Sequence, residues 1–540
     1  MSRIFSALLA ASTILVPTLA NAADWHRAES EHFILYTEDS EENTLEFVQD
    51  LERLNEVIAL FTGVDIAAAD LPPSSKLTVF RYGETRDMSV LAAGNRNTGI
   101  GGFFMPRVTG SVAFVPRQQN RQRGRSRSRD ISREMQLDPR HVLFHEYVHY
   151  FMWQHADAPY PLWYSEGFAE LFANLEFNED HFVIGNVPTS RSASLATVSI
   201  NLEDTFDPQP GRTRNYTART YAHGWLIASH LNLNSERRGQ MGTYMQAIAT
   251  GASRMDAAEQ AFGDLDVLTD ELEEFRRGSA RILRVPYAVN ADPQVQIRRL
   301  SAAEEARMDL MIQLKSEAGE DELDGLVRDG RRLLNRYPNE LPVVLTAMEA
   351  EFDARNYDEA EVLAQRAMEL DPENSEAAIF YADVALHRAF ADSSQLLEAR
   401  RRFGAANQLE NDHPQPLYGY YLTYLLDDEE GTPDNAKIAL EAAFGYARFD
   451  ADVRQALVHM LLEEDRVDEA RVVGARWVDG RGEFQCVMRA KYDQFTEGNR
   501  EPLLEAVRPD HPGEYLDEDA REERTEEFEA EVEEYGCETD

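Results

Sequence analysis

The sequence predicts an α+β domain with a small mixed sheet, followed by an all-α array of helical repeats. Three observations lead to this prediction. Short apolar runs of strand length alternate with one amphipathic helix over residues 30–115. A histidine-containing segment with helical spacing follows near residue 145. From residue 320 onward the chain has a helical pattern, and a four-residue turn sequence recurs after 34 residues.

The first 22 residues have the features of a secretory signal. Arg3 supplies a positive charge, residues 4–19 are almost entirely apolar or small, and Ala20-Asn21-Ala22 fits the small-x-small rule for cleavage. No later stretch approaches the length of a transmembrane helix. We therefore expect cleavage after Ala22 and an exported protein, periplasmic or extracellular, without an integral membrane segment.

Residues 23–285 are expected to form the first domain. Apolar runs predict strands at residues 33–37, 76–80, 100–104 and 111–115, and the last two strands are expected to pair. Between the first two strands, apolar residues recur at helical spacing and predict a helix over residues 41–62.

The segment His145-Glu146-Tyr147-Val148-His149 is the most informative part of the chain. Asp138 and Pro139 precede it and fit an N-cap and a first helical position. On a helix, residues four apart share a face, so His145 and His149 can direct their imidazoles at one metal ion. Glu146 lies beside that ion, where a carboxylate can take a proton from water. The segment therefore predicts a Zn²⁺ site with Glu146 as the general base.

A catalytic zinc site usually has three protein ligands. His155 lies six residues after His149, but that geometry needs a glycine midway, and Met152 stands there. We therefore expect the helix to continue and His155 to lie near its end. Glu166 follows Pro161 in a second predicted helix, and antiparallel packing of the two helices would return it to the histidines. Glu166 is the predicted third ligand.

The pattern His145-Glu146-x-x-His149 followed by Trp163-x-x-Glu166-Gly167-x-Ala169 resembles the gluzincin metallopeptidases, especially the secreted bacterial branch called peptidase-MA-like. The resemblance covers residues 30–285. It implies a zincin-like catalytic domain, in which a small mixed sheet lies against the metal-binding helices, and a peptide or protein substrate. In such folds an edge strand can pair with an extended peptide. The spacing from His149 to Glu166 is slightly shorter than in the aminopeptidase branch, which argues against aminopeptidase specificity.

Three further side chains are candidates for the site. Glu170, one turn after Glu166, can accept a hydrogen bond from a ligand histidine, or it can be a surface acid. Attack on a carbonyl creates an oxyanion, which a Tyr or His donor can stabilise. The segment 220–231 resembles the Tyr-containing helix that follows the zinc site in this family. Tyr221 is the first candidate donor and His223 the second, with ordinary packing in a helix as the alternative.

Residues 286–319 are expected to be a linker and a connecting helix, residues 320–505 helical repeats, and residues 506–540 an acidic tail. Tyr337-Pro338-Asn339-Glu340 recurs as Asp371-Pro372-Glu373-Asn374, at the 34-residue period of tetratricopeptide repeats. A third instance at His413-Pro414 requires an insertion around residues 390–394, and a fourth lies near residues 449–451. Such an array offers a groove for a partner protein. The alternative is a helical bundle that only packs on the first domain.

Charge is distributed unevenly along the chain. The formal net charge of -43 argues against nucleic acid as a partner. Residues 117–133 nevertheless contain seven arginines and one acid, whereas residues 517–540 contain thirteen acids. The basic segment is predicted to be a solvated loop, and attraction to the acidic tail across the cleft is the alternative. Cys486 and Cys537 can form a disulfide that holds the tail, or remain free thiols.

The favoured interpretation is an exported zinc metallopeptidase whose repeats recruit its substrate or a partner protein. One alternative is a catalytically silent zinc-binding scaffold whose repeat array binds partner proteins. Another is a zinc hydrolase that acts on cell-wall peptides. The ligand residues do not separate these interpretations, because the same ligands can hold zinc with or without turnover.

Overall fold

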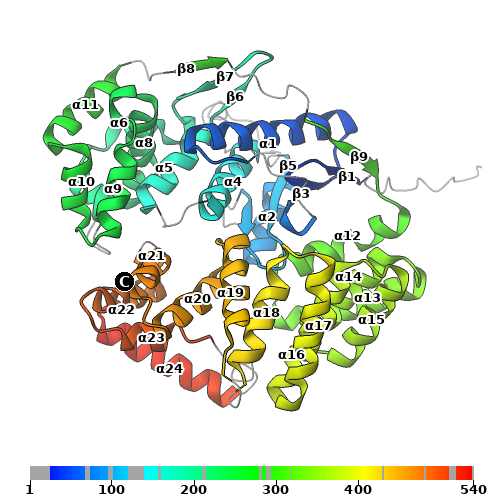
Figure 1. Cartoon of the computed structure of the whole chain (residues 1–540). Coiled ribbons are helices and arrows are strands. Elements are labelled where there is room, and N and C mark those ends of the chain that lie inside the picture. The colour runs from blue at the N-terminus through cyan, green and yellow to red at the C-terminus, as the bar shows by residue number, and fades with distance from the viewer. Residues whose placement is uncertain are drawn as a thin grey trace, which may run out of the picture.

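The computed structural model contains a sheet-bearing module and, below it in Figure 1, an arc of helices. It describes residues 25–66, 73–94, 101–118, 139–155, 160–208, 215–278, 282–286, 293–317, 319–427, 431–478, 482–509 and 518–537. The predicted signal segment, most of the arginine-rich segment and the predicted cap Asp138 lie outside these residues.

The upper module is built on a six-stranded mixed sheet with the order β4-β5-β3-β2-β1-β9. Its strands are β1 (His26–Glu29), β2 (Phe33–Thr37), β3 (Leu77–Glu84), β4 (Phe103–Met105), β5 (Val112–Gln118) and β9 (Gln296–Arg299). β3 runs parallel to β2 and β5, and the remaining pairs are antiparallel. The structure therefore contains the four strands expected from the sequence and adds β1 and β9. The edge strand β9 lies in the segment that was predicted to be a linker.

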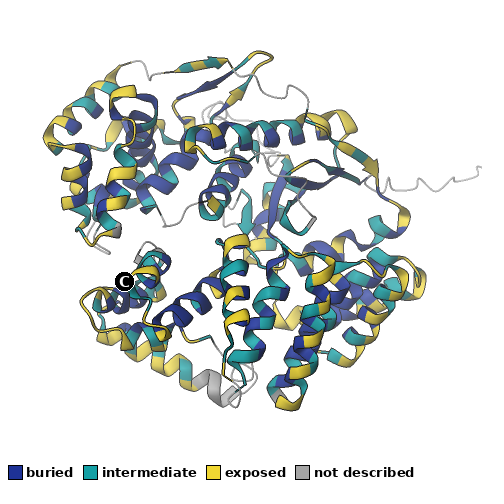
Figure 2. Cartoon of the chain, in the orientation of Figure 1, coloured by how far each residue is buried: buried dark blue, intermediate teal, exposed yellow. Residues whose placement is uncertain are grey.

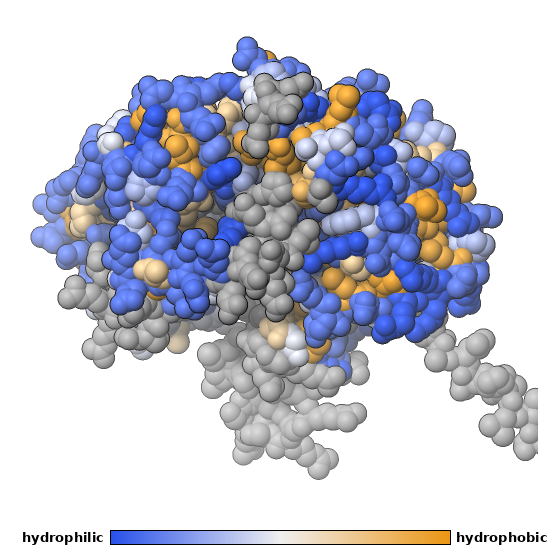
Figure 3. Space-filling model, turned by 90° about the horizontal axis from the view of Figure 1, so that it is seen from below, coloured by the Kyte–Doolittle hydropathy of each residue, from blue (hydrophilic) through white to orange (hydrophobic). Residues whose placement is uncertain are grey.

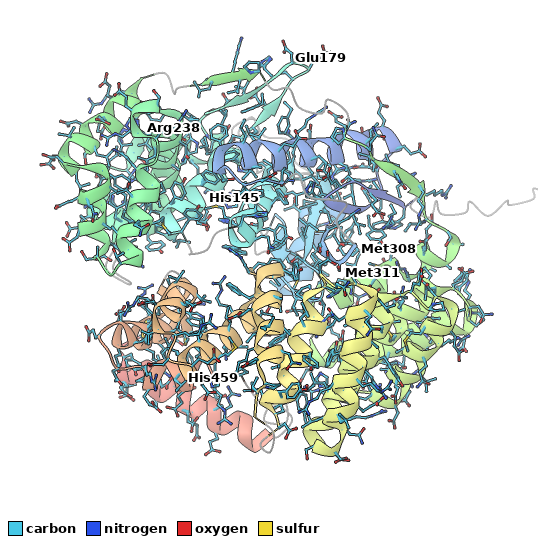
Figure 4. The ribbon with its side chains drawn as sticks, viewed as in Figure 1. His145, Glu179, Arg238, Met308, Met311 and His459 are labelled. Carbon is cyan, nitrogen blue, oxygen red and sulfur yellow. A yellow bond between two sulfur atoms is a disulfide. The ribbon has the colours of Figure 1, made fainter. Side chains whose placement is uncertain are left out.

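The two faces of this sheet pack on different helices because strand residues alternate between them. Phe33 and Leu35 face the core shared with α1 (Glu41–Thr62) and α4 (Pro139–His155). Ile34 and Tyr36 face the opposite core, which α2 (Thr85–Ala93) and α12 (Ala302–Lys315) close. Met308 and Met311 of α12 lie in this second core (Figure 4). The expected connecting helix thus covers one face of the first module's sheet.

The rest of the upper module is mainly helical, with a three-stranded antiparallel sheet of order β6-β7-β8. Its elements are α5 (Leu162–Ala173), β6 (Glu176–Phe177), β7 (His181–Ile184), α6 (Ser192–Thr197), α7 (Leu202–Phe206), a π-helix (Ala218–His223), α8 (Gly224–Leu233), α9 (Gln240–Ala249), α10 (Arg254–Phe262), α11 (Leu265–Arg277) and β8 (Leu283–Pro286). The single-turn helices are Pro73–Ser75, Thr189–Arg191 and Ser235–Arg237.

The lower arc is an array of antiparallel helix pairs in which each helix packs on its neighbours in the chain. Its helices are α13 (Glu320–Arg336), α14 (Leu341–Asp353), α15 (Tyr357–Leu370), α16 (Ser375–Ala391), α17 (Leu396–Leu409), α18 (Pro414–Leu425), α19 (Asp434–Tyr446), α20 (Ala451–Glu463) and α21 (Val467–Gly474). Short helical turns occupy Ser393–Gln395 and Ala475–Val478.

One turn geometry recurs through this array, at residues 337–340, 371–374, 410–413 and 447–450. In each turn the N–H of the fourth residue donates to the carbonyl of the first, at 3.4, 3.2, 3.4 and 3.0 Å. α14 and α16 begin 34 residues apart, at Leu341 and Ser375. The helical turn Ser393–Gln395 adds residues before the third instance, next to the predicted insertion. The chain therefore has an α+β module followed by tetratricopeptide-like helical repeats.

The acidic C-terminal segment forms a helix that is fastened to the end of the array. Two helices, α22 (Glu483–Thr496) and α23 (Glu501–Ala506), follow the array, and the acidic helix is α24 (Glu518–Glu534). A disulfide joins Cys486 in α22 to Cys537 after α24, and Lys491 of α22 pairs with Glu531 of α24 at 2.5 Å. The acidic helix is thus held against α22.

Buried residues lie where successive helices pack together, and exposed residues lie on the outer faces of the helices (Figure 2). Seen from below, the described surface is largely hydrophilic, with separate hydrophobic areas (Figure 3). Across the described ranges, we find no helix with both the length and the apolar character needed to span a bilayer.

The disulfide generates a first prediction. It closes a loop of 51 residues, so reduction should lower the free energy of unfolding of the C-terminal helices by about 4 kcal/mol through loop entropy. Urea unfolding of oxidised and reduced protein measures the difference. A variant with Cys486→Ser and Cys537→Ser is the control, because reductant should not change its transition. Identical transitions for oxidised and reduced wild type would contradict the prediction.

Candidate metal centre

Helix α4 divides its residues between an apolar face and a polar face. Leu143, Phe144, Val148 and Phe151 are buried in the core shared with the sheet and α1. Pro139 occupies the first helical position, where a missing N–H costs nothing. This packing fixes the rotation of the helix about its axis. The opposite face therefore carries the two histidines, and Figure 4 shows His145 inside the upper module above the array.

Helix α5 brings Glu166 to the two histidines of α4. The Glu166 carboxylate oxygen Oε2 lies 3.0 Å from Nε2 of His145 and 3.4 Å from Nε2 of His149. The two Nε2 atoms are 3.2 Å apart. Within the described part of the chain, this is the one cluster of at least three His, Cys, Asp or Glu side chains arranged to hold a metal ion. The structure thus brings together the three ligands expected from the sequence.

The spacing of these three donor atoms fits zinc. Tetrahedral zinc with ligand distances of about 2.0–2.2 Å places its donor atoms roughly 3.3–3.6 Å apart. Of the observed separations, 3.4 Å falls in that range, and 3.0 and 3.2 Å are slightly shorter, so a small outward shift of the donor atoms would admit the ion. Two imidazoles and a carboxylate are also the ligand set of several catalytic zinc sites, which leave the fourth position for water or substrate.

The second ring nitrogen of His149 is engaged away from the cluster. Its Nδ1 is 3.1 Å from the hydroxyl oxygen of Ser165, the residue before Glu166. A donor bond from Nδ1 keeps the proton there and leaves Nε2 free to bind a metal. The ring of His149 also stacks on Trp153 one turn along α4, with 5.8 Å between centroids.

The cluster is electrostatically coupled. Burial disfavours the ionised carboxylate of Glu166, but hydrogen bonds with His145 and His149 outweigh this effect and hold its pKa well below the usual range. Burial likewise disfavours the protonated form of His145, and the hydrogen bond with Glu166 outweighs it and raises the His145 pKa.

Both expectations for Glu170 are wrong: it is not a surface acid, and it forms no hydrogen bond with His145. Its fully buried carboxylate lies 3.8 Å from Nδ1 of His145, which is beyond hydrogen-bonding distance. The guanidinium of Arg191 donates to it through Nη2 at 2.6 Å and Nε at 3.0 Å. Arg191 also lies over the ring of Tyr221, 4.5 Å from its centroid. One arginine thus balances a buried acid and contacts the aromatic ring beside the cluster.

Tyr221 and His223, the two candidate oxyanion donors, occupy different environments. The Tyr221 ring faces the His145 ring, with 6.2 Å between centroids and 23° between planes. His223 is fully buried, and its Nε2 donates to the carbonyl of Val198 at 3.3 Å. Burial lowers the pKa of His223 to about 4, so its ring is neutral. Tyr221 therefore borders the metal ligands, whereas His223 supports the backbone after α6.

His155 is the last residue of α4, which continues through Met152 without a break. It packs against Phe151 and does not belong to the ligand cluster. The sequence expectation for His155 is confirmed. Arg191 and Ser165 were not singled out from the sequence. Ser165 lies next to a predicted ligand, but no local pattern distinguishes Arg191 from the other arginines.

Two glycines allow the helices around the site to approach closely. A Cβ on Gly167 would lie 2.2 Å from the backbone of Gly224, and a Cβ on Gly224 would lie 2.3 Å from the carbonyl oxygen of Trp163. The crossing lies at the junction of the π-helix with α8, three residues after Tyr221. A π-helical turn widens the helix locally and is frequent at functional sites. Gly167 follows Glu166 directly, so this contact fixes the third ligand relative to Tyr221.

Comparisons with known proteins found similar solved structures but no matching family. No family model matches the sequence, and no curated protein matches it. A thermophilic TPR protein of Thermus thermophilus is 16% identical with a TM-score of 0.29, over 36% of this chain and 99% of that one. PilF of Pseudomonas aeruginosa is 15% identical with a TM-score of 0.30, over 38% of this chain and 90% of that one. Both scores are low, so the repeats are recognised by the helices and turns of this chain itself.

The glycine contact generates a second prediction. Gly224→Ala should destabilise the upper module by about 1–3 kcal/mol or more, because backbone atoms cannot move aside as a flexible side chain does. Gly242→Ala is the matched control: it lies inside α9 with nothing within 4 Å of the new Cβ, and should stabilise by about 0.5–1 kcal/mol. Urea unfolding compares the two variants, and equal effects would contradict the prediction.

Proposed function

We propose that this chain is an exported zinc-dependent peptidase. The convergence of His145, His149 and Glu166 carries the proposal, because two imidazoles and a carboxylate lie within 3.4 Å of one another, near the spacing of a tetrahedral zinc site. When bound, zinc supplies Lewis-acid polarisation of a carbonyl and lowers the pKa of water.

The residues around the ligands suit peptide-bond hydrolysis. Glu146 is partly exposed and follows His145 on α4, so its carboxylate can take a proton from the attacking water and return it to the leaving amine. Tyr221 is the candidate for stabilising the oxyanion, since its ring borders His145. Arg191 holds Glu170 and contacts Tyr221, so it supports both sides of the site.

The edge of the six-stranded sheet offers a place for an extended substrate. β4 is the last described strand on that edge, and its Phe104 packs on Tyr150 and Trp153 of α4. A peptide that adds to this edge as a further strand would run beside the helix that carries the histidines. We therefore propose an unfolded or extended protein segment as the substrate.

Export is part of the proposal and has support from the cysteines. The N-terminal 22 residues have the pattern of a cleaved signal, which implies a periplasmic or extracellular location. Cys486 and Cys537 form a disulfide. Disulfides persist mainly in oxidising compartments, which suits a protein that leaves the cytosol.

A second candidate function belongs to the helical array. Stacked helix pairs present an extended surface of the kind that binds peptides and proteins. The chain would then be a zinc-binding scaffold without catalytic activity, and the array would hold a partner protein. A zinc hydrolase acting on cell-wall peptides is a further candidate, since the ligand set does not select the substrate.

A third prediction concerns catalysis. Glu146→Gln should lower the kcat for cleavage of an unstructured peptide pool by about 10²–10⁴-fold, because the amide cannot accept the proton. Zinc content, measured by elemental analysis, should stay equal to that of the wild type. Cleavage by both proteins would contradict the role of Glu146. If neither protein cleaves peptides or purified cell-wall material while both bind one zinc, the scaffold interpretation is favoured.

A fourth prediction separates the ligands from their neighbour His155. His149→Ala and Glu166→Ala should each abolish stoichiometric zinc binding, because they remove one of three donors. His155→Ala should leave zinc binding unchanged, because this side chain packs on Phe151 at the end of the same helix. Elemental analysis after dialysis gives the readout. Loss of zinc in His155→Ala would contradict the assignment.

A further inference from the structure

The turn at residues 447–450 of the array contacts the upper module at two places. Asp450, buried at this turn, accepts the backbone N–H of Val108 at 2.8 Å through its Oδ2 atom. Val108 lies in the loop between β4 and β5 and packs against the apolar cluster of α19 and α20. Phe449 contacts Tyr150 of α4, with 5.3 Å between ring centroids. The same four-residue turn thus contacts the edge hairpin of the sheet and the helix that carries the histidines.

The hairpin loop is itself tightly closed. The N–H of Gly110 donates to the carbonyl of Arg107 at 3.0 Å, and Gly110 has a φ of 124°, a value that other residues rarely adopt. The Arg107 side chain reaches the other end of the array and pairs with Glu317, after α12, at 3.0 Å. Neighbouring residues of one short loop therefore contact opposite ends of the helical arc.

Aromatic contacts continue from this turn to a metal ligand. Phe449 contacts Tyr150, and Tyr150 contacts Phe104 of β4 at 5.3 Å. Phe104 lies 6.2 Å from Trp153, whose ring stacks on His149 at 5.8 Å. The side chain of Gln154 also donates to the carbonyl of Tyr446, the last residue of α19, at 3.0 Å. β4 and the second half of α4 are consequently packed against each other and against the array.

We infer that the array is an internal positioning element for the substrate-binding edge of the peptidase, with Asp450 as its positioning residue. The inference rests on the proposed function, because it assigns peptide binding to β4. In this arrangement the 447–450 turn holds the β4–β5 hairpin at a fixed distance from α4. The array therefore sets the affinity of the β4 edge for an extended peptide without contacting the metal ligands.

The two oxygens of Asp450 have separate tasks, which permits a selective test. Oδ1 caps α20 by accepting the N–H groups of Asp452 and Val453, each at 3.0 Å. Among the described residues, Oδ2 accepts a hydrogen bond from the N–H of Val108 alone. In Asp450→Asn, the amide oxygen can keep the two capping bonds, and the amide nitrogen then faces another donor at Val108. The substitution removes this one hydrogen bond between the modules and retains the cap.

The matched control is Asp264→Asn in the full-length protein. Asp264 caps α11 by accepting the N–H groups of Asp266 and Val267, and it is part of no contact with the array in the described structure. Arg107→Gln is a second test variant, since it removes the ion pair with Glu317 at the other end of the arc. Both test variants alter polar contacts and leave the apolar cores unchanged.

Hydrogen exchange of residues 101–118 and peptide kinetics test the inference together. Asp450→Asn should speed exchange in this segment about tenfold and raise the KM for an extended peptide about three- to tenfold. kcat and zinc content should stay unchanged, whereas destabilisation of the whole site would lower both. Arg107→Gln should act in the same direction, and Asp264→Asn should change nothing.

Two results would overturn the inference: unchanged exchange in Asp450→Asn, or faster exchange with an unchanged KM. If the wild type cleaves no peptide, the proposed function fails. The exchange measurement then still decides whether Asp450 holds the hairpin, so the two failures remain distinguishable.

Discussion

The packing of α4 between the sheet and α5 is the constraint on which the remaining structure depends. Its apolar face has one way to fit the core, and this orientation directs His145 and His149 to the same side. The third donor comes from another helix, whose position is fixed by the contact between Gly167 and Gly224. A three-donor site thus results from two packing contacts, neither of which includes a donor side chain of the site. Displacement of either contact by about an ångström would separate donor atoms that now lie within 3.4 Å of one another.

Each of the two carboxylates at the cluster, Glu166 and Glu170, has its own stabilising partner. Glu166 is stabilised by the imidazoles, and the buried Glu170 is stabilised by Arg191. A buried carboxylate without such a partner would destabilise the folded protein. The helical turn that carries Arg191 therefore stabilises the fold and also lies beside the site. Arg191 also contacts Tyr221, whose ring faces His145. The positions of Glu170 and Tyr221 therefore both depend on the Arg191 side chain.

Much of this arrangement was predictable from local sequence patterns. Helical spacing placed the two histidines on one face, and a turn signal followed by Glu166 and a glycine led to the carboxylate that lies beside them. The 34-residue turn pattern predicted the array. The strands β1 and β9 were missed because each has only four residues and little alternation of polar and apolar side chains. The partners of Glu170 and Asp450 lie 21 and 342 residues away in the chain, at Arg191 and Val108. Contacts of this kind depend on the tertiary structure and have no local signature.

The strand β9 and the helix α12 change how this chain can be divided. A boundary at residue 285 looks natural in the sequence, because prolines and small polar residues follow it. A fragment ending there would lose the strand that completes one edge of the sheet and the helix that covers Phe80 and Phe114. Those rings would face water, and the fragment would be prone to self-association. Because Leu310 and Leu314 of α12 also pack on Leu326 and Ala350 of the array, this helix joins the two cores, and a cut on either side of it would expose apolar surface.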